Sequence, residues 1–267
     1  MNDTRFARGL KHLNHVEGTD QPSIVAALHD IAPDLARFTV EFAYGDVYAR
    51  PGLSPRYRQL ATISALAVIG NARPQLKFHI LGALNVGCTP TEVIETLMHI
   101  IAYAGFPAGL NGIFAAKEAF LERQMLPIEH ETRTTMPQDL EQRYREGWAA
   151  LSTIDGEAGF RVIGSLKDIA PDLGRFIVEF AFGDIYTRPG IDLITREIAT
   201  VAALTAMGTA TPQLKVHIHG LLNVGGTQTQ LVETIIHTAV YAGFPAAINA
   251  MLTAKEVLAE RATDTHT

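Results

Sequence analysis

The sequence lacks the features that mark several common classes of protein. It has one cysteine, Cys88, among 267 residues, so no disulfide can form within a chain. It has no run of basic residues and a net charge of −6, which argues against a nucleic-acid partner, since phosphates need positive charge to neutralise them. Charged residues, histidines, glycines and prolines interrupt the apolar runs well before the ~20 residues of a membrane span. Because the first residues also contain no apolar signal region, we expect a cytoplasmic protein without a membrane partner.

Motifs of metal, nucleotide and serine-nucleophile chemistry are absent as well. The chain has no HExxH motif, no paired Cys/His spacing, no P-loop, no GxGxxG and no Ser nucleophile elbow. His217 and His219 stand two residues apart, but on a helix this spacing points them to nearly opposite sides. We therefore expect no bound metal.

What the chain does contain is a long internal repeat. Residues 31–123 align without a gap with residues 169–261, and more than half of the aligned positions are identical. A period of 138 residues is far too long for a solenoid and indicates a duplicated domain. The stretch between the copies is polar and contains two prolines, which is typical of a linker. We predict a first domain over 1–125, a linker over 126–142 and a second domain over 143–267.

The pattern within each copy is helical. Proline stands at the start of several apolar-periodic segments and glycine at their ends, while no alternating strand pattern or Asn-Gly hairpin signal occurs. Thr89 and Glu92 have the spacing of a capping box at a helix start. We predict an all-α fold of two tandem, homologous helical domains, each with six or seven helices.

One segment of each copy places a carboxylate, a histidine and a tyrosine four residues apart, so that they share one face of a helix. A carboxylate one turn from a histidine can fix its tautomer and raise its pKa, which suits a general acid or base. The alternative is a buried stripe in which the histidine only hydrogen-bonds to its neighbours. The residues are Glu95, His99 and Tyr103 in the first copy and Glu233, His237 and Tyr241 in the second.

Each copy has a further histidine and a matched arginine. His79 and His217 each follow a glutamine by one turn, and either could be a core histidine that this glutamine satisfies. Arg58 and Arg196 also match across the copies. They could bind a substrate carboxylate, for which the guanidinium fork is well shaped, or they could belong to structural ion pairs.

Taken in order, these residues resemble the carboxymuconolactone decarboxylase family, whose fold is that of the alkylhydroperoxidase D-like proteins. The resemblance covers nearly the whole of each copy and implies the all-α fold. The pattern is Arg-Pro-Gly, a second Arg, His-x7-Gly-x-Thr and Glu-x3-His-x3-Tyr-x-Gly-x-Pro. In the first copy it consists of Arg50, Pro51, Gly52, Arg58, His79, Gly87, Thr89, Glu95, His99, Tyr103, Gly105 and Pro107, and the second copy repeats it 138 residues later.

The peroxidase members of this fold carry a Cys-x-x-Cys pair seven and four residues before the first histidine of the pattern. Here those places hold Ala72 and Gln75 in the first copy, and Ala210 and Gln213 in the second. A thiol–disulfide cycle needs two sulfurs within reach of each other. The resemblance therefore favours the decarboxylase-like branch over a peroxidase-like oxidoreductase.

The resemblance implies a cofactor-free carboxy-lyase that acts on a small anionic substrate, such as a carboxylated lactone or a keto acid of aromatic catabolism. Its substrate accepts the electrons released with CO2, so the site must supply donors for the developing charge and a general acid. The implied catalytic residues are His79, His99, His217, His237 and Glu197. The implied substrate-binding residues are Arg58, Arg196, Tyr103, Tyr241, Glu95 and Glu233.

The copies differ at one implied site position. Family members often carry Arg-Glu at the start of the second helix, which is Arg196-Glu197 in the second copy but Arg58-Gln59 in the first. A glutamine cannot exchange a proton, so we expect the second copy to be the main catalytic half.

Two further expectations concern assembly and the competing function. Because single-domain members form rings of six, three duplicated chains are expected to form an equivalent homotrimer, with sites that can mix residues from both copies. The competing reading is a non-catalytic ligand-binding or assembly protein. Catalytic histidines should line a pocket that also holds an Arg or Lys, whereas structural ones should be enclosed by apolar side chains with both ring nitrogens satisfied.

Overall fold

The computed structural model describes residues 4–128 and 139–264. Within these residues all regular elements are helices and no strand occurs, which confirms the all-α fold of two tandem copies. The first copy consists of α1 (Arg5–Glu17), α2 (Ser23–Leu28), α3 (Pro33–Phe38), η1 (Thr39–Tyr48), α4 (Pro55–Ile69), α5 (Arg73–Asn85), α6 (Pro90–His99) and α7 (Ile101–Glu122). The second consists of α8 (Leu140–Ile154), α9 (Gly156–Ser165), α10 (Pro171–Phe176), η2 (Ile177–Tyr186), α11 (Leu193–Met207), α12 (Thr211–Asn223), α13 (Gln228–Ala242) and α14 (Phe244–Asp264).

Helix α8 begins inside the segment 126–142 that the sequence assigns to the linker, and part of that segment lies outside the described residues. No helix in the described part of the chain is long and apolar enough to cross a membrane.

Local sequence signals account for the ends of the main helices. The side chain of Ser54 accepts a hydrogen bond from the backbone N–H of Tyr57 ahead of α4, and Gly70 ends that helix at φ 75°. The predicted capping box of α6 is present, because Thr89 accepts from the Glu92 N–H while the Glu92 side chain accepts from the Thr89 N–H. These local signals thus determine where the helices that carry the candidate residues begin and end.

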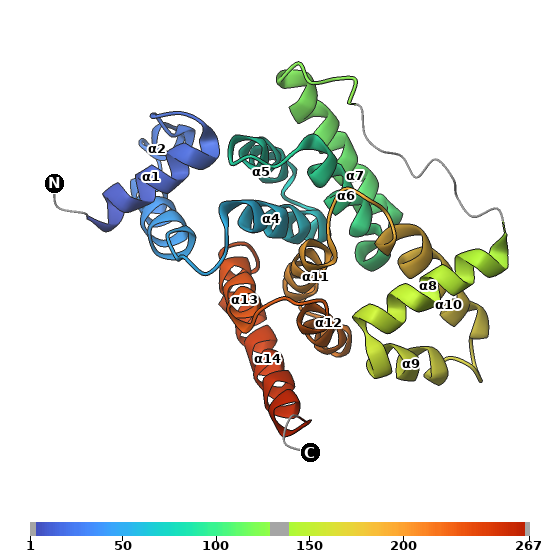
Figure 1. Ribbon diagram of the computed structural model, residues 1–267. Helices are drawn as coiled ribbons and strands as arrows, with labels where there is room; N and C mark the ends of the chain where they lie inside the picture. Colours follow the sequence, from blue (N-terminus) through green and yellow to red (C-terminus); the bar gives the residue numbers. More distant parts are fainter. Residues whose placement is uncertain (1–3, 129–138, 265–267) are drawn as a thin grey trace.

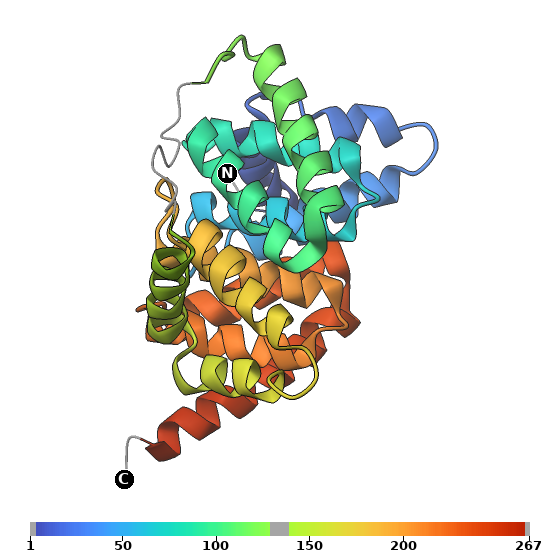
Figure 2. The ribbon, with the colours of Figure 1, turned by 90° about the vertical axis from the view of Figure 1, so that its right-hand side faces the viewer.

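The two copies pack around a central pair of helices, α4 and α11, which lie side by side in Figure 1. Figure 2 shows the first copy, blue to green, stacked on the second, yellow to red. Helix α13 of the second copy packs on α4 and η1 of the first, and α6 and α7 of the first copy pack on α11 and η2 of the second. The helices that carry the histidine–tyrosine stripe therefore face the opposite copy.

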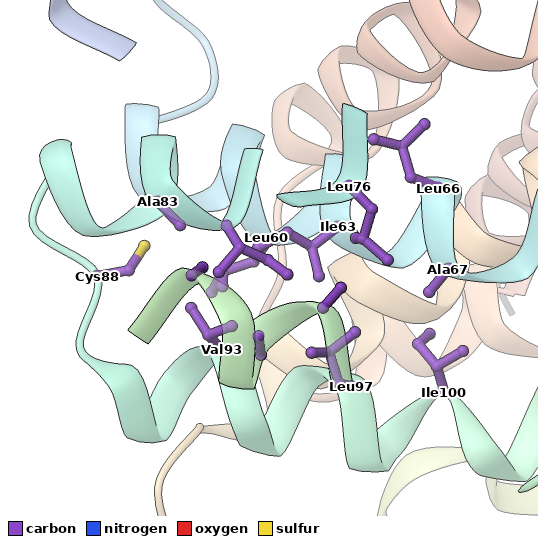
Figure 3. Packing of buried hydrophobic residues seen from close by; sticks show 14 of the residues in the cluster. Leu60, Ile63, Leu66, Ala67, Leu76, Ala83, Cys88, Val93, Leu97 and Ile100 are labelled. Atoms are coloured by element: carbon purple, nitrogen blue, oxygen red, sulfur yellow. The ribbon is translucent and has the colours of Figure 1, made fainter. Parts of the chain in front are cut away.

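The hydrophobic core continues across this contact. Leu60 of α4, Leu76 of α5 and Leu97 of α6 are buried together, as Figure 3 shows, and Ala203 of α11 joins them from the other copy. Cys88 lies in the same core, where burial raises the pKa of its thiol to about 11. A protonated thiol packed among apolar side chains contributes here as a small hydrophobic group.

Each copy also contains a ten-residue π-helical segment, η1 and η2, that continues the preceding α-helix. Such segments are rare and are frequent at functional sites. Each ends in a tyrosine, Tyr48 or Tyr186. Helix α1 can approach η1 closely because Gly9 lies against the carbonyl of Val40, where a Cβ atom would overlap it.

Candidate active site

Two equivalent cavities lie at the contact between the copies. The first cavity, about 350 Å³, is lined by residues of the first copy that include His79 and by Val240 and Tyr241 of the second. The second cavity, about 330 Å³, reverses this arrangement, with His217 from the second copy and Tyr103 from the first. A larger surface hollow of about 570 Å³, on α8 to α10, contains no histidine. Each candidate site is therefore built from both copies.

In the second cavity, four side chains close a circuit of hydrogen bonds. Nδ1 of His217 lies 3.1 Å from Oε2 of Glu197, and Nε2 lies 3.4 Å from the hydroxyl of Tyr103. The Tyr103 hydroxyl is 2.6 Å from that of Tyr186, which donates to Oε1 of Glu197 at 2.5 Å. With both ring nitrogens protonated, His217 donates at both ends of the circuit, and each acceptor is matched by a donor.

The charges around His217 favour this protonated form. Burial alone would lower the pKa of His217, but the negative charges of Glu197 and Asp155 outweigh it and raise the pKa to about 9. Oδ1 of Asp155 lies 3.8 Å from Nδ1 of the same imidazole. Burial raises the pKa of Asp155 to about 6, with the charge of His217 acting against the shift and that of Glu197 adding to it. The wall of the second cavity thus carries the imidazolium of His217 and the carboxyl group of Asp155, with the carboxyl group of Glu197 buried behind them.

The first cavity has an equivalent circuit, in which the histidine again donates from Nδ1 but the other three hydrogen bonds run in the opposite direction. Nδ1 of His79 lies 2.9 Å from Oε1 of Gln59, whose amide nitrogen donates to the hydroxyl of Tyr48 at 3.4 Å. The Tyr48 and Tyr241 hydroxyls are 2.6 Å apart, and the Tyr241 hydroxyl is 3.4 Å from Nε2 of His79. Because burial lowers the pKa of His79 to about 3, this imidazole is neutral, donates from Nδ1 and accepts at Nε2.

The other two histidines lie behind the cavities rather than in their walls. His237 places Nε2 at 2.8 Å from the hydroxyl of Thr62, and His99 places Nε2 at 2.7 Å from that of Thr200. Both rings are fully buried and neither lines a cavity. Burial, with the nearby positive charge of an arginine, lowers the pKa of both well below its usual range. Both are therefore neutral and are held by threonines of the opposite copy.

The two arginines predicted to bind substrate form buried ion pairs between the copies. Nη2 of Arg58 lies 3.1 Å from Oε2 of Glu233, and Nη2 of Arg50 lies 2.6 Å from Oε1 of the same carboxylate. The equivalent cluster joins α11 to α6. There Arg196 lies 3.5 Å from Glu95, and Arg188 lies 2.7 Å from the same carboxylate. None of these side chains lines either cavity. Their geometry connects α4 to α13 and α11 to α6.

The structure thus divides the residues that the sequence grouped. It brings His217 and Glu197 together with Tyr103, and His79 together with Tyr241, in each case across the copies. It places His99, His237, Arg58, Arg196, Glu95 and Glu233 outside the cavity walls, and Glu197 is also outside them, fully buried behind His217.

Sequence reasoning missed four side chains, two π-segment tyrosines and two acids. Tyr48 and Tyr186 are matched in the repeat, and a scan for polar residues retained in both copies would have found them. Glu17 and Asp155 are also 138 residues apart and line the two cavities, but they precede the part of the repeat with high identity.

The observation expected to separate catalytic from structural histidines gives a mixed outcome. His79 and His217 do line cavities, yet among the described residues no Arg or Lys lines either one. Among the described residues that line the second cavity, His217 is the one that carries a positive charge. In the part of the chain that is described, no cluster of three or more His, Cys, Asp or Glu side chains has the geometry of a metal site.

Comparison with known proteins gives the wider context. The profile of the Carboxymuconolactone decarboxylase family matches residues 33–118 and 171–256. The 4-carboxymuconolactone decarboxylase of Acinetobacter baylyi is 38% identical over 118 residues, which are 44% of this chain and 87% of that protein. The nitrosuccinic acid decarboxylase of Metarhizium robertsii is 33% identical over 84 residues, 32% of this chain and 58% of that protein.

A solved structure, described as a gamma-carboxymuconolactone decarboxylase subunit from Burkholderia xenovorans, aligns over 96% of this chain and 98% of its own, with a TM-score of 0.59 and 23% identity. That likeness supports the fold of the whole chain. The two profile matches cover well over half of the residues, one in each copy. The chain belongs to the carboxymuconolactone decarboxylase family, with the family's helical domain present twice.

Proposed function

We propose that the protein is a cofactor-free carboxy-lyase whose main catalytic site is the second cavity. The observation that carries this proposal is the hydrogen-bond circuit that holds a protonated His217 between Glu197 and Tyr103 in a cavity wall. The two named decarboxylases among the relatives support the reaction class. The volume of about 330 Å³ suits a small organic acid.

The proposed substrate carries a carboxylate beside a group that can accept an electron pair. A carboxylated lactone and a nitro acid, which the two relatives are named for, share this feature. When the carbon–carbon bond to the carboxylate breaks, CO2 leaves and the electron pair moves into the lactone carbonyl or its equivalent. No further electron sink is needed, so the protein has to bind, orient and exchange one proton.

The second cavity offers two contributions to this step. The Nε2–H group of His217 makes only a long contact, 3.4 Å, with the Tyr103 hydroxyl, so a substrate oxygen on which negative charge develops can take its place while Nδ1 stays bonded to Glu197. The apolar part of the wall, with Ile177 and Phe182, removes water from the substrate carboxylate, which loses its charge as CO2 forms. Both effects lower the barrier to carbon–carbon bond cleavage.

For the residues behind the cavities we propose positioning roles. The ion pairs of Arg58 with Glu233 and of Arg196 with Glu95 hold the stripe helices against the opposite copy. His99 and His237 fix the same contact through Thr200 and Thr62. In this proposal these side chains position the cavity tyrosines and do not contact the substrate. The resemblance, by contrast, implies catalytic or substrate-binding roles for them. Arg58, Arg196, Glu95, Glu233, His99 and His237 are thus proposed as positioning residues, while His217 and Tyr103 line the cavity and Glu197 holds His217 in its charged form.

A homotrimer of pseudo-sixfold form remains part of the proposal. Each copy exposes three large apolar residues at equivalent positions, one helical turn apart and 50–60% exposed. Faces of this kind on a soluble chain are typical of self-association. The residues are Phe106, Leu110 and Phe114 on α7 and Phe244, Ile248 and Leu252 on α14.

The alternative function, binding without catalysis, has most support at the first cavity. Gln59 cannot exchange a proton, and His79 is neutral. The first cavity would then bind a small ligand through the hydroxyl of Tyr241 and the imidazole of His79 without the charged pair.

The test is release of CO2 from a panel of butenolide carboxylates, β-keto acids and nitrosuccinate. The wild-type chain should act on at least one of them. His217→Asn should reduce kcat by about 10²–10⁴-fold, and the matched variant His79→Asn should reduce it less than about tenfold. No turnover with any substrate, or a His217→Asn variant with wild-type turnover, would remove the basis of the proposal.

A further inference from the structure

Asp155 is a buried acid in the second cavity that the circuit around His217 does not use. It caps the C-terminal end of α8, is 7% exposed and lines the cavity. Its Oδ1 atom is buried and has no hydrogen-bond partner. It lies outside both segments that match the family profile. A buried carboxylate oxygen without a donor is costly, and a ligand or a proton would satisfy it.

The ionisable groups that face Asp155 come from four elements. They are His217 on α12, Glu197 on α11, Tyr186 at the end of η2 and Tyr103 on α7. Glu197 accepts from His217 at 3.1 Å and from Tyr186 at 2.5 Å, whereas Oδ1 of Asp155 stands 3.8 Å from His217. Asp155 thus lacks the close donors that Glu197 has, and a proton on its carboxyl group would meet that deficit.

The charge of the cavity sets the need for that proton. With His217 protonated and both carboxyl groups ionised, the cluster carries a net charge of −1. An anionic substrate would raise this to −2 in a cavity whose described lining has no Arg or Lys. Uptake of one proton restores the charge of the empty site, and decarboxylation of a carboxylate itself consumes one proton.

We propose that Asp155 takes up a proton when an anionic substrate binds and delivers it to the substrate after CO2 has left. The proposal rests on the carboxy-lyase function given above. The carbon–carbon bond to the carboxylate breaks, and its electron pair moves into the substrate's own acceptor. That pair then forms a new C–H bond with the proton of Asp155, whose O–H bond breaks to leave a carboxylate. The balance is one carboxylate and one proton in, one protonated carbon and one CO2 out.

Two observations agree with this assignment. Burial raises the pKa of Asp155 to about 6, close enough to neutrality for one added negative charge to protonate it. The first cavity carries an acid at the equivalent place, Glu17, whose Oε2 atom also has no partner. A glutamate can therefore be accommodated at this place, which makes Asp155→Glu a reasonable rescue variant.

The experiment measures proton uptake separately from turnover. The probe is γ-butyrolactone-γ-carboxylate, a saturated lactone acid that has no conjugated acceptor and cannot lose CO2. Calorimetric binding at pH 7.5 in buffers of different ionisation enthalpy should give uptake of about one proton per bound probe in the wild type, and an affinity that falls roughly tenfold per pH unit above pH 6. Asp155→Asn should bind without uptake, and the matched control Glu157→Gln, an exposed acid two residues away, should behave as the wild type.

Turnover provides the second measurement. Asp155→Asn should lower kcat for CO2 release by about 10²–10⁴-fold, and Asp155→Glu should restore part of it. Uptake that persists in Asp155→Asn, a wild type that binds without uptake, or a wild type that does not bind at pH 5.5 would overturn the inference.

The two failures can be told apart. If the probe binds with proton uptake that depends on Asp155, but no substrate releases CO2, the carboxy-lyase function is refuted. The second cavity would then be an anion-binding site coupled to proton uptake. CO2 release that Asp155→Asn leaves unchanged would keep the lyase and remove Asp155 from the reaction.

Discussion

Oε2 of Glu197 lies 3.1 Å from Nδ1 of His217 and holds that imidazole in its charged form. At the equivalent place in the other copy, the amide oxygen of Gln59 holds a neutral His79. One difference between two otherwise matched circuits thus gives the chain two histidines of opposite character. This difference between Glu197 and Gln59 can be tested directly by substitution.

The first prediction concerns stability as a function of pH. The pKa of His217 is about 9 in the folded chain and near 6.5 when unfolded, so its stabilising contribution is fully present below pH 6.5 and is lost as the pH rises through 9. The difference in unfolding free energy between wild type and His217→Asn should shrink over that window, by on the order of 1–3 kcal/mol. Denaturant titrations at several pH values measure it.

His79 should show the opposite dependence. Burial lowers the pKa of its imidazole to about 3, so the unfolded chain binds a proton below pH 6.5 that the folded chain does not, and stability falls as the pH drops towards 3. His79→Asn should remove part of that acid sensitivity. Equal pH dependence in the two histidine variants would contradict the assigned protonation states.

The second prediction is that Gln59→Glu changes the character of the first cavity. A carboxylate at 2.9 Å from Nδ1 should raise the pKa of His79, as Glu197 raises that of His217. The chain already accommodates glutamate at the equivalent place, so folding should be preserved. NMR titration of the His79 ring would follow the shift, and turnover per chain should stay the same or increase. An unchanged His79 titration in a folded variant would argue against the mechanism of the pKa difference.

The third prediction separates structural from substrate-binding ion pairs. Glu233→Gln leaves the buried guanidinium of Arg58 without its carboxylate, so the unfolding free energy should fall by about 3–5 kcal/mol. Glu118→Gln, which breaks an exposed pair with Arg73, is the control and should cost about 0–1 kcal/mol. Turnover per folded molecule should change little. A large rise in KM at unchanged stability would instead support the substrate-binding role that the resemblance implies.

The fourth prediction concerns the cysteine. The thiol of Cys88 is buried in the core of the first copy, and burial raises its pKa to about 11, so it is neither accessible nor ionised. Cys88→Ser should lower stability by about 1–3 kcal/mol, because a polar hydroxyl replaces a thiol packed in the apolar core, and leave turnover per folded molecule intact. A folded but inactive Cys88→Ser chain would point back to sulfur chemistry.

Sequence patterns were sufficient to predict the helices and the helix faces on which the site residues lie. The caps at Ser54, Gly70 and Thr89 rest on contacts within a few residues, which is why they can be predicted locally. Glu233, His237 and Tyr241, spaced four residues apart, do share one helix face, because all three lie on α13. Spacing determines a shared face, but it carries no information about which helix that face meets.

The exchange of residues between the copies therefore could not be predicted from spacing. Because both copies carry the same site residues, the sequence leaves open whether Tyr103 meets His79 of its own copy or His217 of the other. The packing of α4 on α11 brings Tyr103 to His217. The π-helical segments were also not predictable, because the change from α to π hydrogen bonding has no residue signature here. They determine where Tyr48 and Tyr186 enter the circuits.

The most direct test of the central claim is the rate of CO2 release by Glu197→Gln, measured per folded molecule together with its melting temperature. The substitution gives the second cavity the circuit of the first, a neutral imidazole held by an amide, at a place where the chain already tolerates glutamine. We expect a folded chain whose kcat falls by about 10²–10⁴-fold. A lowered melting temperature with full turnover would contradict this expectation. Glu197 would then be only a structural partner of His217, and the second cavity would not be the main catalytic site.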